Sequence, residues 1–100
     1  MSTTTDHRKA AQDRILALKA MLEAQPREAN RDALIQECAA LATAIAAFHM
    51  EGIRFRMFNV DRILARHTVE VPAEGISAFT EARQHLEAAG FHTRSHQAPS

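Results

Sequence analysis

Turn-forming and large aromatic residues are scarce in this 100-residue chain. It contains no tryptophan or tyrosine, three glycines and three prolines. An all-β domain needs turn residues about every 8–12 positions, so this composition argues against that class. The 20 alanines favour closely packed helices instead.

Cysteine is nearly absent as well. The single residue, Cys38, cannot form an internal disulfide, and its neighbours lack the CxxC or Cys/His spacing of a metal site. A reducing cytoplasm is therefore the expected compartment. Because Cys38 is in phase with the apolar face of a helix, we predict a small core residue rather than a nucleophile.

The chain also lacks an excess of one charge and a long apolar run. Twelve basic residues balance twelve acidic ones, so net charge does not favour nucleic acid as a partner. No 18-residue apolar span and no apolar signal core occur in the chain. We therefore expect no contact with a membrane and no secretion.

Apolar residues spaced three and four apart predict three helices. The first covers Asp6 to Gln25, with Thr5 or Asp6 as its N-cap. The second begins between residues 26 and 31 and continues without a proline to about Arg66. The third centres on residues 76–86 and closes at Gly90, which suits a left-handed C-terminal position with Phe91 folding back on Leu86.

The long second helix carries two apolar seams. One repeats every seven residues, and the other projects about 120–160° away from it. One partner helix cannot cover both seams, so we expect an all-α fold with three antiparallel helices around one long central helix, completed to a bundle by homodimerisation. Gly52 within this helix marks a close crossing or a bend, and a break of the helix there is the main alternative. The expected interface is the first seam, Leu34, Leu41, Phe48 and Phe55, and the second seam is Ile53, Met57, Val60 and Leu64.

An α+β fold is the alternative. Residues 68–71 are β-branched and acidic and end at a proline, so 68–71 and 91–95 also suit two short parallel strands. In either case residues 1–100 form one domain, with disordered tails at 1–5 and 96–100.

The six histidines are the first candidates for chemistry. His49 and Arg56 share a heptad row between the two seams, and with Glu51 or Glu37 nearby they suit an anionic ligand or acid–base work. In the alternative interpretation, His49 and Arg56 each bond to a carboxylate of a neighbouring helix. The other candidate pair, His92 and His96, has the i, i+4 spacing of metal ligands but follows the Gly90 stop, so no metal or other cofactor is expected.

Residues 53–67 are basic and residues 70–87 are acidic. This complementarity predicts that Arg62 and Arg66 contact acidic groups of the following helix or of a partner chain. Aromatic residues alternate with the arginines as they do on nucleic-acid surfaces, yet the adjacent acidic stretch argues against that function.

No phosphate loop, nucleophile elbow or paired-carboxylate motif occurs in the chain. The expected function is a small homodimeric interaction or regulatory module that presents a helical surface to another protein and has no catalysis of its own. The alternative is a ligand-binding or catalytic bundle that uses His49 and Arg56.

Overall fold

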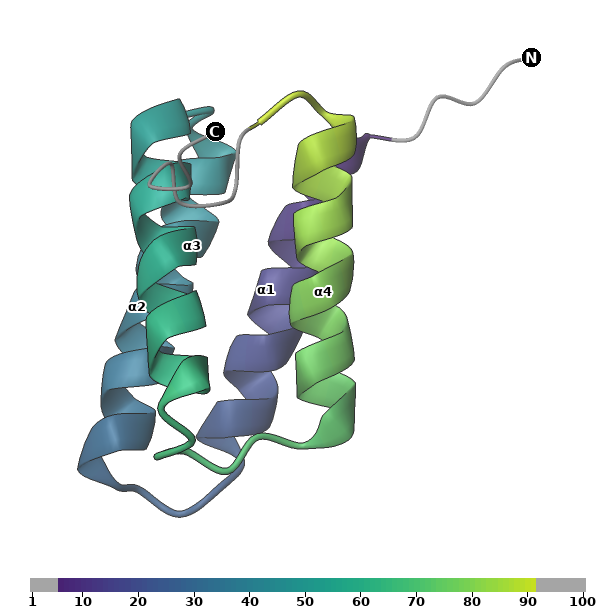
Figure 1. The fold of residues 1–100 in the computed structure, drawn as a ribbon. Helices are drawn as coiled ribbons and strands as arrows, with labels where there is room; N and C mark the ends of the chain where they lie inside the picture. Colours follow the sequence, from purple (N-terminus) through teal and green to yellow (C-terminus); the bar gives the residue numbers. More distant parts are fainter. Residues whose placement is uncertain (1–5, 92–100) are drawn as a thin grey trace.

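The computed structural model describes residues 6–91, which contain four α-helices and no strand (Figure 1). The all-α prediction is therefore confirmed, although four helices are present instead of three. The predicted tails at 1–5 and 96–100 lie outside the described residues. The helices are α1 (His7–Glu23), α2 (Ala29–Ala46), α3 (Met50–Ala65) and α4 (Ala73–Ala88).

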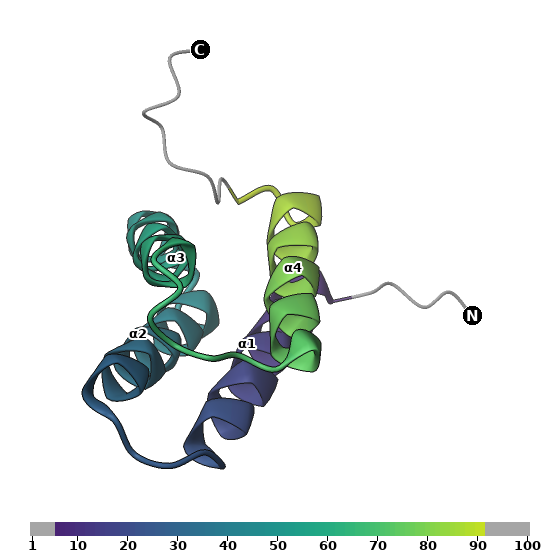
Figure 2. The same cartoon turned by 60° about the horizontal axis from the view of Figure 1, so that its bottom comes forward.

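Each helix runs antiparallel to the one before it (Figure 1). α1 packs against both α2 and α4, and α2 also packs against α3, whereas no Cα of α3 lies within 8 Å of one in α4. Seen towards the helix ends, α1 and α2 form a base from which α3 and α4 rise on the same side (Figure 2). α3 and α4 therefore contact each other through side chains rather than through closely approaching backbones.

One apolar core connects the four helices. Every helix contributes buried side chains at helical spacing, as expected for helices that each bury one face. The inner face of α3 consists of residues that the sequence assigned to the second seam. The fully buried large side chains include Ile15, Leu18 and Leu22 of α1, Leu34, Leu41 and Ile45 of α2, Ile53, Met57 and Val60 of α3, and Leu86 of α4.

The predicted long central helix is wrong, because the chain reverses between Ala46 and Met50. Phe48 has a left-handed φ of 58°. Its N–H donates to the Ile45 carbonyl at 3.1 Å, and the N–H of His49 donates to the Ala44 carbonyl at 3.0 Å. These two bonds are the Schellman pattern that ends many helices, here with phenylalanine where glycine is usual.

This reversal explains how both seams are covered. Folding α3 back on α2 makes the two apolar surfaces face each other, so Leu41 and Met57 are both fully buried in one chain. A second copy is not needed to cover them, and Leu34 and Leu41 are not exposed for an interface. The other two residues of the predicted interface remain at the surface, because Phe48 is 63% and Phe55 is 56% exposed.

The other helix ends follow the sequence signals more closely. Asp6 caps α1 by accepting from the N–H of Lys9 at 3.0 Å, as predicted. α2 begins within the predicted interval, although Glu28 is its cap and accepts from the N–H of Asn30 at 2.8 Å. At the end of α4, Gly90 has a φ of 95° and the Phe91 N–H donates to the Leu86 carbonyl at 2.9 Å, which confirms the predicted stop.

The α+β alternative is contradicted where it can be compared with the structure. Residues 68–71 form no strand, and Val69 and Val71 pack against the helical core from the α3–α4 connection. These β-branched side chains are therefore partly buried against the helical core and do not belong to a sheet. Of the second proposed strand, only Phe91 belongs to the described residues, and it is not in a strand.

Candidate functional site

Two of the three predicted ligand residues line one groove between α2 and α3. His49 and Arg56 contribute to a surface groove of about 410 Å³, whose other walls are mostly small side chains. Glu51 does not line it and instead approaches Arg54 of its own helix at 3.8 Å. The remaining lining residues are Ala40, Thr43, Ala44, Ala47 and Gly52.

The imidazole of His49 has a structural task in this groove. It is the N-cap of α3, and its Nδ1 accepts from the N–H of Gly52 at 2.8 Å. A Cβ atom on residue 52 would lie 2.6 Å from this nitrogen, so the glycine leaves room for the ring. Because only a deprotonated nitrogen accepts a hydrogen bond, this cap fixes the tautomer of His49.

Arg56 is also engaged within the chain. Its Nη1 donates to Oε1 and Oε2 of Glu37 on α2, at 3.1 and 3.3 Å, and the Asn59 amide donates to the same Oε1 at 3.1 Å. This is the carboxylate partner that the alternative interpretation predicted for Arg56. An anion entering the groove would have to compete with Glu37 for the guanidinium.

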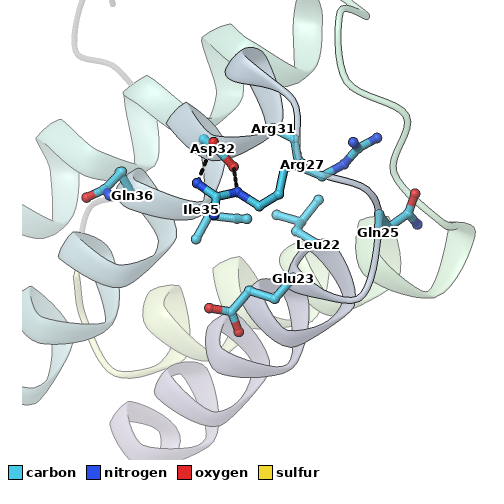
Figure 3. A pocket seen from close by; sticks show the side chains of 8 residues that line it. All are labelled: Leu22, Glu23, Gln25, Arg27, Arg31, Asp32, Ile35 and Gln36. Atoms are coloured by element: carbon cyan, nitrogen blue, oxygen red, sulfur yellow. Dashed lines mark hydrogen bonds and ion pairs between the residues drawn. The ribbon is translucent and has the colours of Figure 1, made fainter.

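A second cavity of about 410 Å³ lies between the end of α1 and the start of α2 (Figure 3). Arg27 turns towards Asp32 and donates to its carboxylate at 3.1 and 3.3 Å. Arg31 is only 9% exposed, and its Nη1 donates to the Pro26 carbonyl at 2.6 Å. Its Nε has no hydrogen-bond partner in the part of the chain that the structure describes.

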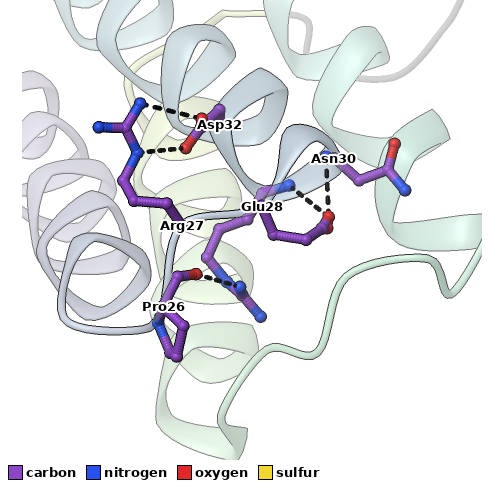
Figure 4. A network of polar contacts seen from close by, with 6 residues as sticks. Pro26, Arg27, Glu28, Asn30 and Asp32 are labelled. Carbon is purple, nitrogen blue, oxygen red and sulfur yellow. Dashed lines mark hydrogen bonds and ion pairs between the residues drawn. The ribbon is translucent and has the colours of Figure 1, made fainter.

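The charges around this second cavity cancel. Glu23 and Asp32 offset Arg27 and Arg31, and the turn before α2 is closed by its own polar contacts (Figure 4). Glu28 accepts there from two backbone N–H groups, so the N-terminus of α2 is already capped. The cavity therefore lacks the excess positive charge that would attract an anion.

A histidine pair that the sequence analysis missed joins the first turn of α1 to the last turn of α4. The Nδ1 atoms of His7 and His85 are 2.9 Å apart, so one ring must donate while the other accepts. The residues are 78 positions apart, and no local motif connects them. Among residues 6–91 no group of three or more metal-ligand side chains is assembled, and His92 and His96 lie outside that range.

Cys38 is a core residue, as predicted. It is fully buried in α2, and burial, assisted by the charge of Glu37, raises the pKa of its thiol to about 12. The thiol therefore stays protonated at neutral pH and is a poor nucleophile.

The solvent-facing side of α3 is the remaining candidate. We define the α3 outer stripe as Glu51, Phe55, Phe58, Arg62 and Ala65, which recur at alternating spacings of four and three residues. All are exposed except Phe58, which is half-buried. Arginine side chains flank both rings, with Arg56 Cζ 5.0 Å from the centre of Phe55 and Arg62 Cζ 5.6 Å from that of Phe58.

The predicted ion pairs of Arg62 and Arg66 are not present within the described residues. The ion pair between α3 and α4 has the opposite polarity, because Arg83 of α4 donates to Asp61 of α3 at 2.5 and 2.6 Å. Arg62 is exposed beside its aromatic neighbour. The part of the prediction that placed these contacts on the following helix is therefore wrong, and pairing with a partner chain stays a prediction.

No protein-family model, curated protein or solved structure matches this chain. Within residues 6–91, no helix combines the length and the apolar character that a membrane crossing requires.

Proposed function

We propose that this chain is a small helical interaction module that acts as a homodimer through the α3 outer stripe and has no catalytic activity of its own. The observation that carries this proposal is the exposure of Phe55, beside the half-buried Phe58, on a helix whose opposite face is fully buried. The Phe55 side chain contributes little to the core of the single chain, because it is 56% exposed. Its removal from water on association would supply a favourable free energy.

The composition of the stripe supports a protein partner. Aromatic residues and arginine are the types enriched at protein–protein interfaces and at their energetic hot spots. Here two phenylalanine rings lie beside Arg56 and Arg62. Phe58 takes the place that Leu34 and Leu41 had in the interface expected from the sequence.

A second copy is the partner that we favour. The chain has a formal net charge of zero, so two copies meet without long-range repulsion. We also propose the cytoplasm as the location, because the only thiol is buried and no disulfide is needed.

The ligand-binding alternative has weaker support. The Nδ1 of His49 is committed to the α3 cap, and the Arg56 guanidinium is committed to Glu37. A ligand in this groove would have to replace both interactions, and Glu51 is too far round the helix to assist. We therefore assign these residues a structural role in the proposed function.

Multi-angle light scattering tests the proposal. The wild-type chain is expected to have about twice its mass of 11.1 kDa, and Phe55→Lys is expected to shift the protein to the single-chain mass. Leu16→Lys is the matched control, because Leu16 is another large exposed apolar residue, 42% exposed but on α1. A monomeric wild type, or equal effects of the two substitutions, would contradict the proposal.

A further inference from the structure

The α3 outer stripe has a polarity along the helix that indicates how two copies fit together. It begins with an acidic residue, Glu51, continues with Phe55 and Phe58, and then reaches a basic residue, Arg62. The alternating spacing of four and three residues is that of the contact positions in a coiled coil. Two such stripes can therefore pack along their length.

The stripe is self-complementary in the antiparallel direction. Glu51 and Arg62 are equally far from the midpoint between residues 56 and 57, and Phe55 and Phe58 are also equally far from it. A two-fold axis through this midpoint brings unlike charges together at both ends and aromatic rings together at the centre. Parallel pairing would place each charge opposite its own copy, which is unfavourable.

Both charges are free to pair in this way. Arg62 forms no ion pair with any other described residue, and the only such partner of Glu51 is Arg54 in the same helix, at 3.8 Å. The stripe is also accessible, because α3 lies at the outer edge of the molecule with its packed side towards α2 (Figure 2). No described helix covers it.

From this arrangement we infer that α3 pairs with α3 of a second copy in an antiparallel, two-fold contact. Glu51 faces Arg62 of the partner subunit, and Phe55 packs against the partner's Phe58. This inference rests on the proposed homodimer and specifies its geometry. Each dimer then contains two equivalent ion pairs, one at each end of a central cluster of four rings.

Charge reversal tests the contact. In Glu51→Arg and Arg62→Glu, two like-charged pairs replace the two ion pairs, so the dimer dissociation constant measured by sedimentation is expected to rise about tenfold or more. The double variant restores unlike pairs and should return the constant to within about threefold of wild type. The matched control is Lys19→Glu with Glu23→Lys on α1, where reversal is expected to leave the constant unchanged.

Cysteine cross-linking tests the register. Glu51→Cys and Arg62→Cys should each give little disulfide-linked dimer alone, because identical positions are far apart in the antiparallel pair. Their equimolar mixture should give the mixed cross-linked dimer. The natural Cys38 is buried and does not compete.

The possible results separate this inference from the proposed function. If the wild type is a dimer but the charge reversals leave the dissociation constant unchanged, the antiparallel contact is overturned and the homodimer stands. Efficient cross-linking of Glu51→Cys by itself would have the same meaning. A wild type that is monomeric at every concentration overturns both. The α3 outer stripe would then bind a different partner, such as another protein or single-stranded nucleic acid.

Discussion

Phe48 shows how one residue redirects the whole chain. A left-handed φ costs a non-glycine residue roughly 1–2 kcal/mol, yet Phe48 adopts it at 58° between α2 and α3. The Schellman hydrogen bonds and the burial of Ile53 and Met57 that the reversal permits offset this cost. The Phe48 ring also forms a cation–π contact, because Arg8 Cζ lies 4.7 Å from the ring centre.

Comparing glycine with alanine at Phe48 tests this backbone assignment. Both substitutions remove the ring, so their difference reports the backbone, and Phe48→Gly is expected to be more stable than Phe48→Ala by about 1 kcal/mol. Phe55 is the matched control within α3, where the glycine variant should be less stable than the alanine variant by about 1 kcal/mol. Urea unfolding measures both differences. The same sign at both positions would refute the left-handed assignment.

Gly52 and His49 form a second pair whose effects should not add. Gly52→Ala improves helix propensity by up to about 1 kcal/mol, but the new methyl group displaces the His49 ring and removes its cap. We expect little gain or a net loss in the wild type, and a clear gain in a His49→Ala background. A double-mutant cycle should give a coupling of about 1 kcal/mol. Additive effects would show that the imidazole is not held against Gly52.

At the scale of the helices, Asp61 and Arg83 form an ion pair between α3 and α4. Arg83 is nearly buried and donates to the Asp61 carboxylate, in a place where the two backbones do not touch. Asp61→Ala removes this carboxylate from a poorly hydrated guanidinium and is expected to cost about 1–3 kcal/mol.

Asp13→Ala is the control for this substitution. Asp13 is also within a helix and pairs with Lys9 at 2.7 Å, but the pair is exposed, so its loss should cost no more than about 0.5 kcal/mol. Thermal unfolding of the two variants measures the difference. Equal losses would mean that Asp61 adds no more than a surface ion pair.

The sequence identified most helix ends but missed the central reversal. Asp6 and Gly90 are residue types with a known physical preference for helix ends, and both helix ends are where they were predicted. Phe48 and His49 carry no such preference, so the turn exists because the hairpin buries both seams and thereby overrides local propensity. The useful signal was the combination of two seams on one helix of about forty residues, which is far longer than average.

The candidate site could be predicted only in part from the sequence. The i, i+7 relation placed His49 and Arg56 near one groove and allowed a carboxylate such as Glu37 beside Arg56, but it did not reveal that His49 caps α3 at Gly52. The contact between His7 and His85 left no local trace, because it depends on how α1 and α4 pack. Contacts of this kind require the tertiary structure.

At the scale of the whole molecule, the reversal changes the argument for association. The apolar surplus that suggested a dimer is buried within one chain by the α2–α3 hairpin. What remains is smaller and more specific, namely the aromatic and charged α3 outer stripe. An interface of this composition derives its free energy from a few central residues, which are Phe55 and Phe58 in our account.

Isotope-filtered nuclear Overhauser spectroscopy on an equal mixture of labelled and unlabelled chains shows whether α3 meets α3 of a second copy, because it detects only contacts between copies. We predict intermolecular signals between the ring protons of Phe55 and Phe58. Signals confined to Leu16 of α1 or Ile76 of α4, the exposed apolar residues of the other helices, would contradict the account, as would a spectrum without intermolecular signals.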